Sequence, residues 1–319
     1  MTDTKVSIFD QDLPQTPANH APISPLGFIE RTAEVYPHRL AIVHGDLRQD
    51  WATTYRRCRQ LASALTQAGI GKNDTVAVML PNTPPMVEAH FGIPMAGAVL
   101  NALNTRLDPE AIAFMLEHGE AKVLLTDREF AGVIEGALAQ LGPRRPLVIE
   151  VEDHEAPAGA FLGDLSYEQF LAEGDPQHAW ALPSDEWNAI ALNYTSGTTA
   201  RPKGVQLTHR NLWLNSAVFG WQMGVSDRDV YLHTLPQFHC NGWGMLYSVT
   251  AMGGKHIMIR KIDGAEILRR IEEHGVTLLC GAPAVANMIL DAAQTWDGPI
   301  PGRDRVRIVL AGAPPPSKT

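Results

Sequence analysis

The sequence contains few cysteines, and their positions indicate no shared role. Cys58, Cys240 and Cys280 are the three cysteines among 319 residues, and none lies in a CxxC pair. An odd and sparse set does not build a disulfide framework. We therefore expect the chain to work in a reducing compartment, the cytoplasm.

A long apolar run and a secretory signal are also missing. The longest apolar stretch, around residues 91–103, is interrupted by Pro94 and Asn101. It is too short and too broken to cross a bilayer, which takes about 20 apolar residues. The start of the chain, MTDTKVSIFDQDLP, has no apolar segment after basic residues. We expect no transmembrane segment.

A basic excess is absent as well. The chain has 26 Lys and Arg against 35 Asp and Glu, a net charge of −9. Nucleic-acid surfaces are usually basic, so we expect no nucleic-acid partner. With 45% hydrophobic residues, the chain can bury the core of one large domain or two smaller ones.

Short apolar runs bounded by turn residues alternate with segments of helical period. The predicted strands are 75–80, 122–126, 188–193, 230–233, 255–259, 277–279 and 307–310. The predicted helices are 84–95, one starting at Asp108-Pro109-Glu110, 210–223, 263–274 and 284–293. Such alternation predicts an α/β fold with largely parallel sheets flanked by helices. The acidic, Gly/Pro-containing segment 150–164 suggests two stacked lobes, residues 1–180 and 181–319.

The stretch YTSGTTARPKG, residues 194–204, follows an apolar run and combines hydroxyl side chains, glycines and Lys203. Glycines let backbone N–H groups approach phosphate oxygens, hydroxyls add donors, and a lysine adds positive charge. The spacing is not that of a Walker A loop, and no GxGxxG is present in the stretch. Composition alone favours an exposed linker.

The order of the residues is more specific than their composition. The stretch resembles the phosphate loop TSGTT-G-x-PKG of the adenylate-forming superfamily, which includes acyl-CoA synthetases. The matching positions are Thr195, Ser196, Gly197, Thr198, Thr199, Pro202, Lys203 and Gly204. Ala200 departs from the pattern, because the family usually has glycine there.

Three other segments resemble core motifs of the same family. TLPQFHCNGWG (234–244) is similar to the motif that lines the acyl and nucleotide sites. LAGAPPP (310–316) is similar to the segment whose backbone lies along the adenine, which implies adenine contacts for Gly312, Ala313 and Pro314. MAGAVLNALNTRLDP (95–109) resembles an early motif in its fatty-acid form.

The resemblance implies a two-step reaction. A carboxylate attacks the α-phosphorus of ATP to give an acyl-adenylate and pyrophosphate, and the thiol of coenzyme A then attacks the adenylate. It implies that Thr195 helps to position Mg²⁺ and the phosphates. Ser196, Gly197, Thr198, Thr199, Lys203 and Gly204 would surround the leaving phosphates. Catalysis of this kind depends on positioning and charge stabilisation.

Within FHCNGW, the resemblance places His239 near the α-phosphate and the carboxylate, and Asn241 beside the substrate. Trp243 would gate the acyl tunnel. Outside the motif, a lone histidine is more often structural and a tryptophan more often part of the core. Cys240 has no base at a readable spacing, so we expect a small buried residue and not a nucleophile.

The substrate is expected to be a carboxylic acid without an amino group. Amino-acid-activating relatives carry an aspartate one residue past the phenylalanine, whereas Phe238 is followed here by His239. An ammonium buried without a partner is costly. The resemblance favours medium- or long-chain fatty acids, with a short acid such as methylmercaptopropionate as an alternative.

In full-length relatives, a magnesium-binding glutamate, a ribose-binding aspartate and an adenylation lysine follow later in the chain. We therefore expect an N-terminal part of a larger enzyme, with little or no ligase activity alone. Two other hypotheses stay open: a non-catalytic protein that binds nucleotide or acyl groups, and an adenylating enzyme with another acceptor. Family members often dimerise through the large domain, so a homodimer is a further expectation.

Overall fold

A computed structural model describes residues 6–157, 159–195 and 202–313 of the chain. The helices are α1 (Leu26–Val35), α2 (Trp51–Gln67), α3 (Pro84–Met95), α4 (Pro109–His118), α5 (Ala131–Leu141), α6 (Tyr167–Glu173), α7 (His209–Met223), α8 (Met245–Met252), α9 (Gly264–His274) and α10 (Pro283–Ala293), with short 3₁₀ turns at Arg128–Phe130 and Gly142–Arg144. The strands are β1 (Leu40–His44), β2 (Leu47–Asp50), β3 (Thr75–Met79), β4 (Val99–Ala102), β5 (Ala121–Asp127), β6 (Leu147–Val151), β7 (Leu165–Ser166), β8 (Ala189–Tyr194), β9 (Gly204–Thr208), β10 (Val230–Leu232), β11 (Lys255–Ile257), β12 (Leu278–Gly281) and β13 (Arg307–Leu310).

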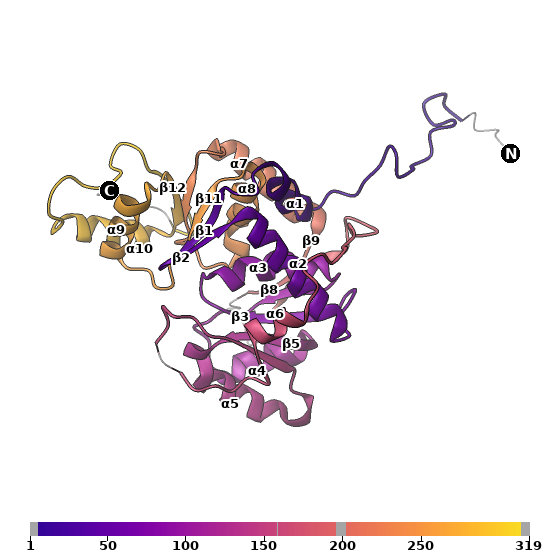
Figure 1. Cartoon of the computed structure of the whole chain (residues 1–319), viewed down its shortest axis with the longest axis horizontal. Helices are drawn as coiled ribbons and strands as arrows, with labels where there is room; N and C mark the ends of the chain where they lie inside the picture. Colours follow the sequence, from indigo (N-terminus) through magenta and orange to yellow (C-terminus); the bar gives the residue numbers. More distant parts are fainter. Residues whose placement is uncertain (1–5, 158, 196–201, 314–319) are drawn as a thin grey trace.

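The strands form two sheets that are stacked with helices between them (Figure 1). One has the order β13-β12-β10-β11-β1-β2 and the other β7-β6-β5-β3-β4-β8-β9. Neighbouring strands are parallel except for β1–β2 and β8–β9, which pair antiparallel at the sheet edges. The predicted α/β architecture with two largely parallel sheets is therefore confirmed.

Both faces of each sheet are covered, which is why the strands read as continuous apolar runs. In β3, Val76 and Val78 pack into the central layer with α1, α2, α3 and α8, while Ala77 and Met79 face α4 and α5. The second sheet packs its outer face on α9 and α10. The layers are helix, sheet, helix, sheet, helix.

The division expected at residue 180 does not separate the two sheets. Strands β1 and β2, from residues 40–50, join β11 in the six-stranded sheet. Strand β8, from residues 189–194, joins β4 in the seven-stranded sheet. Local patterns identify strands but carry no information on pairing between segments that lie about 100 to 200 residues apart in the chain.

Several elements begin where their sequence predicts. Helix α3 spans the predicted residues 84–95, with two prolines at its start. The carboxylate of Asp108 accepts the N–H of Ala111 at 2.8 Å and so caps α4. Asp263 caps α9 in the same way through Glu266. These side chains satisfy N–H groups that the first turn of a helix leaves unpaired.

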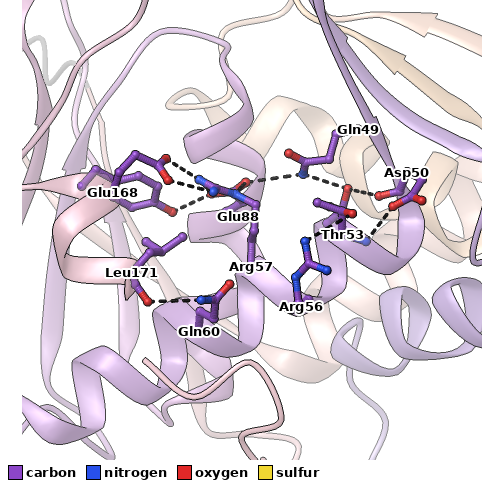
Figure 2. Close-up of polar contacts among 11 residues, drawn as sticks. Gln49, Asp50, Thr53, Arg56, Arg57, Gln60, Glu88, Glu168 and Leu171 are labelled. Carbon is purple, nitrogen blue, oxygen red and sulfur yellow. Dashed lines mark hydrogen bonds and ion pairs between the residues drawn. The ribbon is translucent and has the colours of Figure 1, made fainter. Parts of the chain in front are cut away.

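Helix α3 is buried on nearly all sides, and it carries a carboxylate, Glu88, with no solvent exposure. The guanidinium of Arg57 on α2 donates to Glu88 at 2.6 Å and to Glu168 on α6 at 2.6 Å (Figure 2). The hydroxyl of Tyr167 donates to Glu88 at 2.8 Å. Burial disfavours the Arg57 cation, but the bonds to Glu168 and Glu88 outweigh it and raise the pKa of Arg57. This network fixes three helices against one another.

We predict that Arg57→Ala lowers the free energy of unfolding by about 3–5 kcal/mol, because it leaves the Glu88 carboxylate buried without its cation. Urea denaturation followed by circular dichroism measures this. Arg56→Ala is the matched control: Arg56 is the exposed neighbour on α2, and its removal is expected to change stability by less than about 0.5 kcal/mol. Equal effects of the two substitutions would contradict the assigned role of the network.

Candidate active site

The predicted site residues follow the carboxyl ends of strands in both sheets. Thr195 follows β8 of the seven-stranded sheet, while the segment with His239 follows β10 and Gly312 follows β13 of the other sheet. In parallel α/β sheets, ligands bind outside the carboxyl ends of the strands, where loops from several strands converge. This edge is therefore the candidate site.

The loop predicted to hold phosphates closes a β-hairpin. Strands β8 and β9 pair antiparallel, with Tyr194 opposite Gly204. The N–H of Thr195 donates to the carbonyl of Lys203 at 3.0 Å, and the N–H of Lys203 donates to Thr195 Oγ1 at 3.4 Å. Thr195 and Lys203 thus face each other at the base of the loop, and both are exposed.

The tip of this loop lies outside the described residues, and so do Ser196, Gly197, Thr198, Thr199 and Ala200. At its base, Lys203 forms no ion pair with a carboxylate in the described ranges. An exposed ammonium without such a partner can bind an anion without first breaking a salt bridge. The described part of the hairpin therefore suits a phosphate group.

The segment after β13 runs along the same edge. The N–H of Ala311 donates to the carbonyl of Gly281, the last residue of β12, at 3.1 Å. Gly312 then adopts a positive φ of 95°, and Gly312 and Ala313 are exposed. Exposed backbone in this position can lie against a planar ring, as the family resemblance implies for adenine. Pro314 lies outside the described residues.

The loop that carries His239 leaves its ring exposed. The backbone N–H of His239 donates to Pro236 at 3.1 Å, and Nε2 lies 3.8 Å from Cys240 Sγ. The prediction that Cys240 is buried is wrong, because the loop turns its side chain outward. Desolvation still raises the pKa of its thiol, which disfavours the thiolate that a nucleophile needs.

The residues after His239 form a left-handed turn. All five residues from Cys240 to Gly244 have positive φ, between 48° and 75°. For a residue other than glycine, this conformation costs roughly 1–2 kcal/mol. Gly244 is needed here, since a Cβ on it would lie 2.5 Å from Asn215 Nδ2. Backbone strain of this kind is concentrated at functional sites.

The two predicted substrate residues lie in this turn. Asn241 is fully buried, and its amide nitrogen and oxygen have no hydrogen-bond partner among the described residues. Trp243 is half-buried, with its ring 6.2 Å from that of Phe219 on α7. Its carbonyl accepts a hydrogen bond from Asn215 Nδ2 at 3.0 Å. The turn thus packs Trp243 against α7.

Asn82 is a site residue that motif comparison missed. It follows β3, is buried, and its Nδ2 donates to the carbonyls of His233 at 2.7 Å and Leu235 at 2.8 Å. Its Oδ1 accepts the N–H of Gln237 at 2.9 Å. One amide therefore joins the end of a strand in one sheet to the loop of the other. The only signal was a polar residue directly after a buried strand.

Arg260 forms a second link between the sheets. It follows β11 and donates to Asp127, at the end of β5, at 2.9 Å, and to Asp153 beyond β6. His44, at the end of β1, contacts the same Asp153 at 2.8 Å. Burial alone would raise the pKa of the Asp153 carboxyl. The hydrogen bond with His44 is the largest of the contacts that outweigh burial and lower this pKa. No spacing in the sequence could reveal these partners.

A resident magnesium ion does not fit the described residues. They contain no group of three His, Cys, Asp or Glu side chains that could hold a metal. Thr195 offers a single hydroxyl oxygen, whereas Mg²⁺ is usually bound through one or two carboxylates together with substrate phosphates.

No helix in the described ranges has the length and apolar character needed to cross a membrane.

The fold is that of the N-terminal domains of acyl-CoA synthetases. The N-terminal domain of FACL13 from Mycobacterium tuberculosis superimposes with a TM-score of 0.79 at 24% identity, over 92% of this chain and 71% of that one. The chain belongs to the family described as AMP-binding enzyme, which matches residues 29–319.

Curated relatives are similar over almost the whole chain. The acetate/butyrate–CoA ligase AAE7 of Arabidopsis thaliana, described as peroxisomal, is 43% identical over 96% of this chain and 55% of its own length. The peroxisomal benzoate–CoA ligase of the same plant is 41% identical, over 96% of this chain and 54% of its own length. The chain thus spans about half the length of the curated relatives it matches.

We predict that acid weakens the fold through four buried histidines. Burial lowers the pKa of His90 and His209 to about 4 and of His256 to about 3, and the pKa of His233 also lies well below its ordinary value. Between pH 6.5 and 4 the unfolded chain therefore binds protons that the folded chain does not. The free energy of unfolding should fall by up to about 1.4 kcal/mol per pH unit for each histidine.

Urea denaturation at pH 7.5 and pH 5.0 measures this loss. His209→Gln should reduce the pH slope, whereas His38→Ala, at a side chain that is 92% exposed, should leave it unchanged. Equal stability at the two pH values would contradict the prediction.

We also predict that Asn82→Ala lowers the free energy of unfolding by about 2–4 kcal/mol, because it leaves two buried carbonyls and one N–H without partners. Thermal and urea unfolding measure the effect. Asn211→Ala, at an exposed asparagine on α7, is the control and should be nearly neutral. A neutral Asn82→Ala variant would show that the loop does not depend on this amide.

Proposed function

We propose that the protein takes part in ATP-dependent activation of a carboxylic acid followed by transfer of the acyl group to coenzyme A. The observation that carries this proposal is the convergence of the Thr195–Lys203 hairpin and the His239 loop on one edge, where Asn82 joins the two sheets. Membership of a family with CoA ligases among its members supports it.

In the first step, a carboxylate oxygen attacks the α-phosphorus of ATP, and the bond to pyrophosphate breaks. In the second step, the CoA thiol attacks the acyl carbon, loses its proton, and AMP leaves. Both steps bring anions together, so their barriers depend on positioning and on nearby positive charge. We assign Lys203 and the hydroxyls of the loop to the departing phosphates, and His239 to the carboxylate and α-phosphate.

The two relatives described above are named for acetate, butyrate and benzoate. These are short or aromatic acids, in contrast to the medium- or long-chain fatty acids that the motif resemblance favours. Trp243 lies with Phe219 against a cluster that includes the buried Tyr231 and Leu235. We propose a short aliphatic or aromatic acid as the substrate.

An exchange assay distinguishes these substrates and acceptors. ATP–pyrophosphate exchange is measured with acetate, butyrate, benzoate, methylmercaptopropionate and palmitate, and product formation is then compared with and without CoA. Exchange that is highest with palmitate would overturn the proposed acid class. Because this chain alone is expected to have little ligase activity, the assay uses the full-length protein. Nucleotide binding by that protein without exchange for any acid would favour the non-catalytic hypothesis.

We predict that Lys203→Ala weakens ATP binding roughly 5- to 150-fold, as loss of a charged hydrogen bond costs about 1–3 kcal/mol. Binding of AMP should be unchanged, because Lys203 is assigned to the phosphates that AMP lacks. Calorimetric titration measures both affinities. Lys72→Ala is the control, an exposed lysine that precedes β3 at the opposite end of the strand. Equal losses for ATP and AMP would contradict the assignment.

We also propose that the protein is located in the cytoplasm and that it forms a homodimer. The absence of disulfides among Cys58, Cys240 and Cys280 supports a reducing compartment, although the two relatives are described as peroxisomal. Light scattering at several concentrations would test the dimer.

A further inference from the structure

A row of four buried polar side chains lies behind the His239 loop. Gln237 Nε2 is 3.1 Å from His233 Nδ1, His233 Nε2 is 2.9 Å from His256 Nδ1, and His256 Nε2 is 3.1 Å from Thr250 Oγ1. All four residues are at most 2% exposed. The row runs from the loop after β10, across β11, to α8.

Each hydrogen bond in this row is donated in the same direction, from Gln237 toward Thr250. The amide nitrogen of Gln237 can only donate, so His233 Nδ1 accepts and its proton sits on Nε2. That proton is donated to His256 Nδ1, which places the His256 proton on Nε2, facing Thr250 Oγ1. In this orientation the amide leaves its carbonyl oxygen and one N–H without a partner among the described residues, whereas the opposite orientation would leave both N–H donors without one.

Both rings are fully engaged and neutral in this arrangement, since each uses one nitrogen as donor and one as acceptor. Burial lowers the pKa of both histidines, and the proximity of His256 and His90 adds to the effect on His233. A neutral ring with both nitrogens bonded has no free site for a proton from the substrate. The row is therefore suited to holding a geometry and not to acid–base catalysis.

The end of the row supports the left-handed turn. A Cβ placed on Gly242 would lie 3.7 Å from the Cγ of Gln237, so Gln237 lies directly against the turn. The backbone N–H of Gln237 is fixed by Asn82 at 2.9 Å. Its side chain is fixed by His233. A Gln237 held at both points provides a rigid support for a strained turn.

We propose that Thr250, His256, His233 and Gln237 form a hydrogen-bonded positioning row that fixes the turn from Cys240 to Gly244 and thereby the placement of His239 and Trp243. For its effect on catalysis, this inference rests on the proposed function. Thr250 and His256 act through Gln237 and are positioning residues. Thr250 is the most informative member to change, because it is the one farthest along the row from the turn.

The first experiment needs no variant. Ring nitrogen shifts of the ¹⁵N-histidine-labelled protein at pH 7 report which nitrogen carries the proton. We expect protons on Nε2 of both His233 and His256, and on Nδ1 of His90, whose Nδ1 lies 2.8 Å from the carbonyl of Met86. Protons on Nδ1 of His233 and His256, or exchange between the two forms, would overturn the fixed direction of the row.

The second experiment compares Thr250→Val, which removes the acceptor and keeps the shape, with Thr250→Ser, which keeps the hydroxyl. We expect the valine variant to shift the His256 and His233 ring signals and the indole N–H signal of Trp243. We expect the serine variant to match the wild type in all three. A wild-type Trp243 signal in the valine variant would overturn the inference.

The third experiment measures kcat and KM separately, because a loss of stability alone would not change kcat at a temperature where the protein is folded. In ATP–pyrophosphate exchange well below the melting temperature, Thr250→Val should lower kcat roughly 10- to 100-fold, with little change in KM for ATP. Thr250→Ser should restore kcat. Exchange is measured on the full-length protein; if its wild type shows no exchange with any acid, the proposed function fails, while the ring and indole signals still decide the positioning row. An unchanged kcat in an active enzyme would overturn the catalytic part.

Discussion

The geometry of the candidate site depends on the side chain of Asn82. Its amide makes three hydrogen bonds across the boundary between the two sheets, to His233, Leu235 and Gln237. Each of these backbone groups would otherwise be a polar group without a partner in a buried region, at a cost of about 1–3 kcal/mol. Because one rigid amide satisfies all three, the loop after β10 is held at a fixed distance from the end of β3. Arg260 adds an ionic link beside it. The loop with His239 is therefore fixed where β3 ends, and β8, which leads into the hairpin with Lys203, ends at the same edge of that sheet.

The sequence predicts individual elements better than their pairing. Helix α3, the cap at Asp108 and the start of α9 near Asp263 follow from local patterns, because capping and helical period act within a few residues. The crossing of β1 and β2 into the sheet of β11 depends on contacts over about 200 residues, which no local pattern reports. Motif comparison located the hairpin and the His239 loop, because their residues recur in a fixed order. Asn82 stands alone after a strand, so the order of residues gives no hint of its partners.

The left-handed turn shows why a motif does not reveal its own conformation. Cys240 and Trp243 have no preference for positive φ, yet both adopt it beside Asn241. The conformation persists because Asn215 holds the Trp243 carbonyl, Phe219 packs on its ring, and Gln237 lies against Gly242. A right-handed turn would send His239 and Trp243 in other directions. The strained backbone thus sets the direction in which these two side chains point. The contacts with Asn215, Phe219 and Gln237 stabilise the turn in this conformation.

Interior cations are paired with carboxylates, whereas Lys203 at the candidate site is not paired with one in the part of the chain that the structure describes. Arg57 and Arg260 are each paired with at least two carboxylates, and burial lowers the pKa of the buried His256, so these interior groups present no free positive charge. Lys203 is different, since it is exposed and has no carboxylate partner in the described ranges. On a chain with a net charge of −9, an anionic substrate is repelled over most of the surface. A cation at the base of the hairpin, beside a rigid polar edge, lowers that repulsion locally. An anion bound at this edge would therefore meet less repulsion than it does over the acidic surface as a whole.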